Sequence, residues 1–347
     1  MSRITVPFFI SHQGCRHACV FCDQRTISGS QGALPNRDEM LCRIAAWRCS
    51  GGDRPLEVAF FGGSFSALDR ADQWRLLEPL QSLIENGAVS GVRISTRPDA
   101  VDAETVVWLA ERGVTTIELG VQSMDDGVLE AAGRGHRAEA SEAAIRCVRA
   151  GGLAAGAQLM PGLPGDTPAL ALSSLEKVMA AGAGFVRLYP VVVLKGTELA
   201  RRYLAGEYRP LSASEGISCC KVLLWTAMKR GIEIIRIGLQ ADQGLNAETV
   251  LAGCWHPALG QLVRSELYFD LLVRLASGLD RSQPITVKCH PSRVSDVIGQ
   301  GRSNVIRLRQ QGLDVRTVLP EPALTPPEIE LLSKQPKKGS LLHDLVY

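Results

Sequence analysis

The stretch GCRHACVFCDQ, residues 14–24, decides the fold class, because three cysteines follow directly after a predicted strand at residues 6–11. Cys15, Cys19 and Cys22 have the spacing C-x3-C-x2-C. Thiolates are the usual ligands of iron–sulfur clusters, and three of them on a cubane leave one iron without a protein ligand. A structural zinc site with His17 as its fourth ligand is the alternative. The position of the stretch between a strand and a helix, without a second ligand pair, favours the cluster.

After residue 56, short apolar runs alternate with longer amphipathic stretches, a pattern that predicts βα units around a parallel sheet. Six strands are predicted at residues 6–11, 57–61, 92–96, 116–120, 155–160 and 186–190, and a further one at 233–238. Helices are predicted at residues 69–85, 103–112, 125–132, 138–150, 169–180 and 214–230. We therefore expect an α/β fold, a partial (β/α)6 TIM-like barrel.

The domain organisation follows from a change of pattern after the last predicted strand. We expect a core barrel at residues 1–240, a helical connector at 241–280, a small β-α-α-β subdomain at 281–320 and a tail at 321–347. Four prolines lie from Pro320 to Pro327, and the tail is expected to run as a strap over the surface. The fold class is thus a barrel with a small C-terminal α+β subdomain.

Composition excludes several function classes. The 347 residues have a net charge of +2, with 38 basic and 36 acidic side chains, so the molecule as a whole is no general nucleic-acid binder. Residues 281–316 are the exception, because this segment contains seven basic side chains, Arg281 included, and only two acidic ones. The sequence opens with MSRITVPFFI and contains no apolar run of about 18 residues, so we expect a cytoplasmic protein without membrane contact.

Five further blocks follow the cysteine stretch: FFGGSFS at 60–66, ISTRPD at 94–99, ELGVQS at 118–123, GRGH at 133–136 and LMPGLPGD at 159–166. With the cysteines, these blocks resemble the radical S-adenosylmethionine (SAM) superfamily. Within it they resemble the elongator catalytic-subunit-like branch, whose founding members modify wobble uridines of tRNA. The resemblance spans nearly all of residues 4–240 and implies a barrel of radical SAM type.

The resemblance also implies the cofactors and a partner. A [4Fe-4S] cluster on the three cysteines would bind SAM at its free iron, and one electron would cleave SAM to a 5′-deoxyadenosyl radical. The electron would come from flavodoxin or ferredoxin. Strand-end residues are expected to bind SAM: a glycine turn for its ammonium group, an arginine for its carboxylate and amides for its ribose. The expected contacts are Gly62, Gly63, Ser64, Gln122, Arg134 and Gln158.

Each of these residues also has a purely structural interpretation. The glycines could serve a tight turn, Arg134 could be a solvated charge and the two glutamines could be buried amides. Arg97 and Tyr189 also lie at strand ends and are expected to contact substrate or cofactor.

The cysteines outside the trio are expected to have little catalytic weight. They are interpreted as small core residues of helices: Cys42, Cys49, Cys147, Cys219 and Cys220. Cys254, beside Trp255 and His256, is a candidate thiol donor, although a packed loop is the favoured interpretation.

The resemblance stops after residue 239, where elongator-type proteins continue into an acetyltransferase domain. No acyl-CoA pyrophosphate loop follows here. The substrate class therefore stays open between RNA and a small molecule or protein, as in the tetrapyrrole-oxidase branch. A variant that only holds a cluster or haem is a third option.

A second, weaker resemblance concerns VIGQGRSNVIRL, residues 297–308, which is similar to the helix-loop-helix of KH domains. Gly299 and Gly301 are two residues apart, and Arg302 occupies the place of the second motif glycine. In a KH-like RNA arm, Arg302, Arg307 and Arg309 would contact phosphates. A subdomain that only caps the barrel rim is the alternative.

Overall fold

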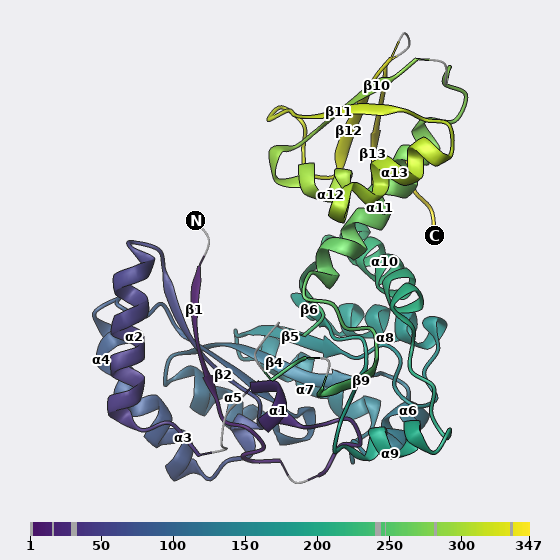
Figure 1. Ribbon diagram of the computed structural model, residues 1–347. Coiled ribbons are helices and arrows are strands. Elements are labelled where there is room, and N and C mark those ends of the chain that lie inside the picture. Colours follow the sequence, from purple (N-terminus) through teal and green to yellow (C-terminus); the bar gives the residue numbers. More distant parts are fainter. Residues whose placement is uncertain are drawn as a thin grey trace.

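The computed structural model describes residues 3–15, 17–28, 33–239, 244–246, 248–280, 283–333 and 336–347. Its main feature is one open sheet of seven parallel strands in the order β1-β2-β3-β4-β5-β6-β8 (Figure 1). All seven predicted strands are present, and the last one extends the expected six-stranded barrel sheet. The strands are β1 (Ile4–Phe9), β2 (Leu56–Phe61), β3 (Val92–Thr96), β4 (Val114–Gln122), β5 (Ala154–Leu159), β6 (Phe185–Leu188) and β8 (Glu233–Ile237).

Helices between the strands pack against one face of this sheet and leave its inner face to the site. Side chains alternate along each strand, so Val58 and Phe60 of β2 face the helices, whereas Glu57 and Phe61 face inward. The helices are α1 (Gln24–Ser28), α2 (Arg37–Gly51), α3 (Arg70–Leu77), α4 (Gln81–Glu85), α5 (Ala103–Ala110), α6 (Asp126–Ala131), α7 (Ala138–Ala150), α8 (Pro168–Ala181), α9 (Glu198–Leu204) and α10 (Ala213–Lys229).

The prediction of one continuous helix at residues 69–85 is wrong. The structure divides it into α3, a short 3-10 turn at Glu78–Leu80 and α4. Pro79 lies in that turn, and a proline inside a helix removes one backbone hydrogen bond and clashes with the preceding turn. Pro79 therefore accounts for the break between α3 and α4.

Two further elements follow the barrel strands. β7 (Val192–Leu194) pairs antiparallel with β9 (Val250–Gly253) as a separate two-stranded ribbon. Val192 and Leu194 of this ribbon pack with Leu245, Ile27 and Leu239. The chain after the barrel thus folds back onto the helix that follows the cysteine loop.

The C-terminal part forms a second sheet of four strands, which Figure 1 shows apart from the barrel and joined to it by α11 (Leu259–Leu275). The predicted β-α-α-β unit is present. The prediction of a strap after residue 320 is wrong, because this segment contributes two strands, and Ile329 and Leu331 are buried in the first of them. The elements are β10 (Ile285–Cys289), α12 (Val294–Ile298), α13 (Ser303–Gln310), β11 (Val315–Pro320), β12 (Glu328–Leu332) and β13 (Lys337–Ser340).

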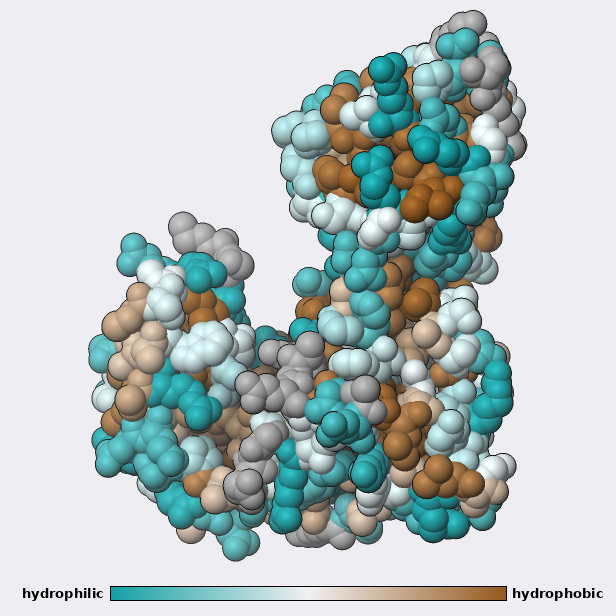
Figure 2. Space-filling model, in the orientation of Figure 1, coloured by the Kyte–Doolittle hydropathy of each residue, from teal (hydrophilic) through white to brown (hydrophobic). Residues whose placement is uncertain are grey.

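The surface mixes apolar and polar side chains. Figure 2 shows a deep indentation between the part that carries α2 and the column of α10 and α11. Within the ranges that the structure describes, every helix is too short or too polar to cross a membrane.

Candidate active site

A cavity of about 490 Å³ lies at the carboxyl ends of the barrel strands. Its walls come from the segments that follow the strands, and they include the three clustered cysteines. Sites of barrel enzymes are found at this end, because loops from several strands meet there. The predicted site residues on its walls are Cys15, Cys19, Cys22, Gly62, Gly63, Arg97, Gln122, Arg134, Gln158 and Tyr189.

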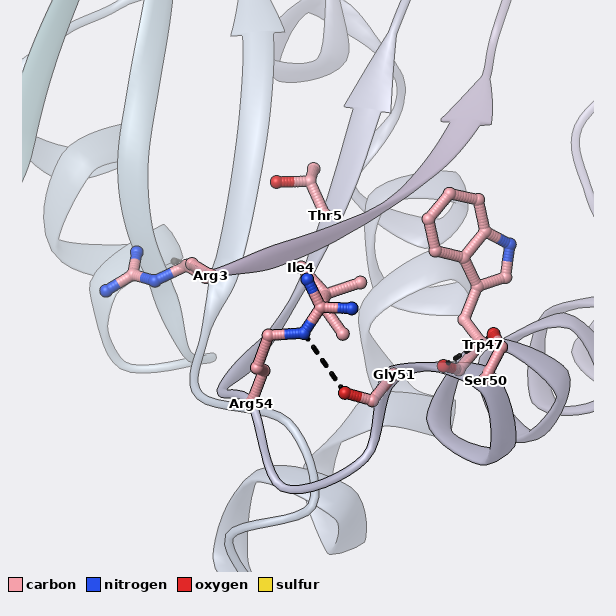
Figure 3. Close-up of a pocket in the computed structure, with 7 residues that line it drawn as sticks. All are labelled: Arg3, Ile4, Thr5, Trp47, Ser50, Gly51 and Arg54. Carbon is pink, nitrogen blue, oxygen red and sulfur yellow. Dashed lines mark hydrogen bonds between the residues drawn. The ribbon is translucent and has the colours of Figure 1, made fainter. Parts of the chain in front are cut away.

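A second cavity, of about 300 Å³, lies at the opposite end of β1 (Figure 3). Trp47 and Ser50 of α2 line it, and Arg54 donates a hydrogen bond from Nε to the carbonyl oxygen of Gly51, 3.1 Å away. No residue of the predicted site lies there. The chemistry expected from the sequence is therefore confined to the carboxyl ends of the strands.

The cysteine loop leads from β1 into α1. Burial raises the pKa of the Cys22 thiol to about 12, and the neighbouring thiols of Cys19 and Cys15 add to the shift. Such thiols stay protonated at neutral pH unless a metal replaces the proton. Ligands of one zinc ion converge on a point, and the described residues contain no such triad of Cys, His, Asp or Glu. In a cubane each cysteine binds a different iron, so three thiols around one cavity fit the cluster.

Two glycines hold the loop after β1 against the loop after β2. A Cβ atom on Gly63 would lie 2.4 Å from the carbonyl oxygen of Ile10 and 2.6 Å from that of Gln13. A Cβ atom on Gly14 would lie 2.2 Å from the carbonyl oxygen of Ser64. Gly63 is therefore required for the close approach of two backbones, as well as lining the cavity.

Ser64 departs from the prediction that it contacts the cofactor. Its side chain is fully buried and is not part of the cavity wall. Its hydroxyl lies 2.9 Å from Oγ1 of Thr96 and accepts a hydrogen bond from the backbone N–H of Arg97. Ser64 thus ties the loop after β2 to the end of β3, because a buried hydroxyl needs partners within the protein.

Arg134 is the predicted residue nearest to the cysteines. Its Nη1 donates to the sulfur of Cys19 at 3.1 Å, and its Nη2 donates to the carbonyl oxygen of Gly120. Nε2 of His136 lies 3.3 Å from Nη2 of the same guanidinium. Burial, and then the charge of Arg134, lowers the pKa of His136 to about 4, so this imidazole is neutral at physiological pH. Arg97 joins the group by donating from Nη2 to the backbone oxygen of Arg134.

Four buried polar atoms of residues on the cavity wall have no hydrogen-bond partner in the described part of the chain. Nε of Arg187 is one of them, although it lies in an ion pair with Glu118, and the other three are Nε of Arg134, Oε1 of Gln122 and Oγ of Ser95. Gln122 also has a positive φ of 70°, which is uncommon for a residue other than glycine. An unpaired buried polar group costs about 1–3 kcal/mol. A ligand with a carboxylate and hydroxyl groups would satisfy the last three atoms, so the wall fits the cofactor expected from the resemblance.

Gln158 lies on the wall, but its amide nitrogen is already engaged. Nε2 donates to Oε2 of Glu118, 3.1 Å away, and Glu118 is fully buried. Arg93 and Arg187 flank the same carboxylate. A ribose contact of Gln158 stays a prediction, and any such contact would use an amide that Glu118 orients.

The sequence analysis missed several residues of this site. Ser95, His12 and the group of Glu118 with Arg187 were not singled out. Glu118 and Arg187 carried a usable signal, because each is a charged residue inside an otherwise apolar strand. His12 carried none: its φ of 61° and the hydrogen bond from Gln24 N to its Nε2 appear only in the folded loop.

The remaining cysteines lie away from the cavity. Cys42 and Cys49 are exposed on α2, so their interpretation as core residues is wrong. Cys254 is buried, its thiol lies 3.7 Å from the carbonyl oxygen of Ala213, and burial raises its pKa to about 11. Cys254 is not on the cavity wall, which agrees with the favoured interpretation of a packed loop.

Comparison with known proteins gives two adjacent family matches. Residues 9–177 match the model of the Radical SAM superfamily, and residues 183–268 match that of the Radical SAM C-terminal domain. Together they cover the barrel and most of the connecting helix α11.

Individual relatives are similar over the barrel. A tRNA uridine(34) acetyltransferase of Methanocaldococcus jannaschii is 28% identical over 60% of this chain, which spans 41% of that protein. The heme chaperone HemW of Haemophilus influenzae is 24% identical over 57% of this chain and 54% of its own length. Thus the chain spans about half the length of these curated relatives or less.

One solved structure has a similar fold over a larger share of the chain. Elp3 of the archaeon Methanocaldococcus infernus matches with a TM-score of 0.64 and 23% identity, over 78% of this chain and 63% of that one. At this identity the match supports the fold.

Proposed function

Since this chain belongs to the radical SAM superfamily, in its elongator-like branch, and is a radical SAM enzyme with a [4Fe-4S] cluster and SAM as cofactors, we propose that it modifies RNA, with tRNA as the first candidate. The carrying observation is the set of unpartnered polar atoms of Arg134, Gln122 and Ser95 beside the cysteines. The relatives that modify tRNA support the RNA substrate.

In this proposal the protein side chains would bind and orient the cluster and SAM. The cluster would supply the electron for reductive cleavage of SAM to a carbon-centred radical. Cys15, Cys19 and Cys22 would hold the cluster. Arg134 would pair with the carboxylate of SAM through Nε, which has no partner among the described residues, in a charge-assisted hydrogen bond. Gln122 and Ser95 would bind hydroxyl groups. The electron donor would be flavodoxin or ferredoxin, and the protein would work in the cytoplasm.

The C-terminal unit gives limited support to RNA binding. Among the arginines expected to contact phosphate, Arg307 pairs with Glu266 and Arg309 pairs with Asp314. Arg302 is exposed, has a positive φ of 63° and makes no ion pair among the described residues. Arg281, part of the same basic segment, lies outside the described residues. Arg302 is therefore the arginine best placed for a phosphate.

A second candidate function is suggested by the similarity to HemW: an enzyme for a tetrapyrrole-like small molecule. One experiment separates the two. Reconstituted protein is reduced anaerobically with dithionite, and 5′-deoxyadenosine is measured with bulk tRNA or with a protein-free extract of small molecules. Stimulation by tRNA alone supports the proposal. Stimulation by the extract alone would contradict the RNA proposal and make a small molecule the proposed substrate.

A further inference from the structure

The inner face of the barrel sheet carries a chain of charged side chains that the cofactor contacts do not explain. Arg3 donates to Glu57, Arg93 bridges Glu57 and Glu118, and Arg187 completes the chain on the other side of Glu118. Both glutamates are fully buried. Replacing a buried ion pair by apolar residues is often neutral or stabilising, so stability alone is a weak reason for this chain.

The chain of charges ends at a phenol on the cavity wall. Nη2 of Arg187 lies 2.9 Å from Oε1 of Glu118, and Nε of Arg187 lies 2.9 Å from Oε2. Its remaining Nη1 donates to Oη of Tyr189 at 3.1 Å. Because Tyr189 accepts this hydrogen bond, its own hydroxyl hydrogen must point elsewhere, and Tyr189 lines the cavity.

The neighbourhood of Tyr189 is positively charged, because Arg97, Arg134 and Arg187 line the same cavity. Glu118 is shared by Arg93 and Arg187, and the guanidinium of Arg187 also stacks over the ring of Phe61 at 5.3 Å. Phe9, Met160 and Val192 supply apolar wall nearby, and among the described residues no Asp or Glu lines the cavity. A substrate group that accepts a hydrogen bond, such as a carbonyl, fits this wall.

Tyr189 also lies at a different place from the cysteine loop and the glycine turn, although Gln158 is on the neighbouring strand β5. It follows β6, whereas the cysteines follow β1 and the glycine turn follows β2. Strand order places β6 far from β1 in the sheet. The cavity therefore extends from the cysteine loop to Tyr189, and a substrate next to SAM would reach the phenol.

We propose that Tyr189 contacts the substrate and donates a hydrogen bond to a carbonyl or similar acceptor next to the reacting carbon, with Glu118 and Arg187 as positioning residues. This inference rests on the proposed function. Beyond the radical chemistry, the substrate would carry a hydrogen-bond acceptor next to the reacting carbon. It requires the phenol in its protonated form.

The test uses the reconstituted holoenzyme and the ratio of 5′-deoxyadenosine formation with and without a substrate pool. Whichever pool, bulk tRNA or the small-molecule extract, stimulates the wild-type protein is used for all variants. Tyr189→Phe should lower the stimulation about two- to tenfold, the loss of one hydrogen bond. Tyr347→Phe is the matched control, because this phenol binds Asp270 away from the cavity, and it should keep the wild-type ratio.

A pH profile separates donation by the phenol from a structural role. A fluorinated tyrosine at position 189, whose phenol ionises at lower pH, should move the alkaline limb of the stimulated rate to lower pH. Glu118→Gln should move it in the same direction, because the charge of Arg187 would then be uncompensated next to the phenol. An unchanged ratio in Tyr189→Phe, or an unmoved limb with fluorotyrosine, overturns the inference. A wild-type protein that neither pool stimulates overturns the proposed function and this inference with it.

Discussion

Arg134 donates a hydrogen bond from Nη1 to the sulfur of Cys19, 3.1 Å away, although 115 residues separate the two along the chain. The contact links the GRGH block after β4 to the cysteine loop after β1. The same guanidinium retains Nε without a partner among the described atoms and faces the cavity. Arg134 therefore fixes the position of the cysteine loop, and this contact in turn fixes the orientation in which Arg134 would bind the carboxylate of SAM.

Replacing any one of the three clustered cysteines by alanine should abolish cluster assembly. We expect about four iron and four sulfide per chain in the wild-type protein prepared without oxygen, lost together in Cys15→Ala, Cys19→Ala or Cys22→Ala. Iron, sulfide and zinc analysis checks this. Cys42→Ala, on the exposed side of α2, is the control and should keep the full cluster. Zinc without sulfide in the wild-type protein would contradict the cluster.

Arg134→Ala should weaken SAM binding by about 1–3 kcal/mol, because a buried charge-assisted contact is lost. Equilibrium binding of SAM to cluster-loaded protein measures this. Arg134→Lys keeps the charge and loses the planar guanidinium with its Nε donor, so it should recover part of the affinity. Unchanged affinity in the alanine variant would exclude Arg134 from the SAM site.

Gly63→Ala should disrupt cluster loading more than it disrupts folding. The added Cβ would approach two carbonyl oxygens of the cysteine loop within 2.4 and 2.6 Å, so one of the loops must move. Iron content and far-ultraviolet circular dichroism, measured on the same sample, separate the two effects. Gly165→Ala is the control for an added methyl group in open space, although its positive φ of 80° adds backbone strain. Normal iron content in Gly63→Ala would show that the loops yield easily.

His136 should make the protein less stable in acid. Its pKa is lowered to about 4 by burial and by Arg134, against about 6.5 in an unfolded chain. Between these values the unfolded state binds a proton that the folded state excludes, so the free energy of unfolding rises with pH from about 4 to 6.5. His136→Asn should flatten this part of the profile, measured by urea unfolding at several pH values. An equally steep profile in the variant would assign the slope to other groups.

The arginines of the C-terminal unit should separate into two kinds. Arg307 pairs with Glu266 and stacks over Phe269 at 3.6 Å, so Arg307→Ala should cost about 1 kcal/mol of stability. Arg302→Ala should leave stability within about 0.5 kcal/mol. It should also weaken RNA binding equally for all sequences and lower the salt slope by about one phosphate contact. Filter binding over a salt series tests this, and an unchanged slope would argue against a phosphate contact at Arg302.

The sequence predicted the sheet and the cavity because both depend on local patterns. Apolar runs placed the seven strands, and the blocks at strand ends must meet when parallel strands share an edge. The cysteines, Arg134 and Gln122 were found in this way. Ser64 was misplaced because sequence position within a turn does not tell whether a hydroxyl points into the cavity or beneath it.

Other features required the fold itself. The split at Pro79 and the strands β12 and β13 occur where prolines obscured the pattern. The group of Glu118, Arg187 and Tyr189 combines residues from different strands, and their contacts depend on strand order and register. Tyr189 was expected at the site from its position at a strand end, but a single sequence does not give the register, so its link to Glu118 through Arg187 was found only in three dimensions.

The charged chain from Arg3 to Arg187 also has a consequence for how the barrel assembles. Its members come from the residue before β1 and from β2, β3, β4 and β6. Each buried glutamate contacts two arginines, and these contacts form only if the strands take their native order. A strand that slipped by one residue would turn its charge toward the helices and leave its neighbour buried without a partner. Apolar side chains at these positions would tolerate such an error. The ionic chain therefore discriminates against misaligned sheets during folding.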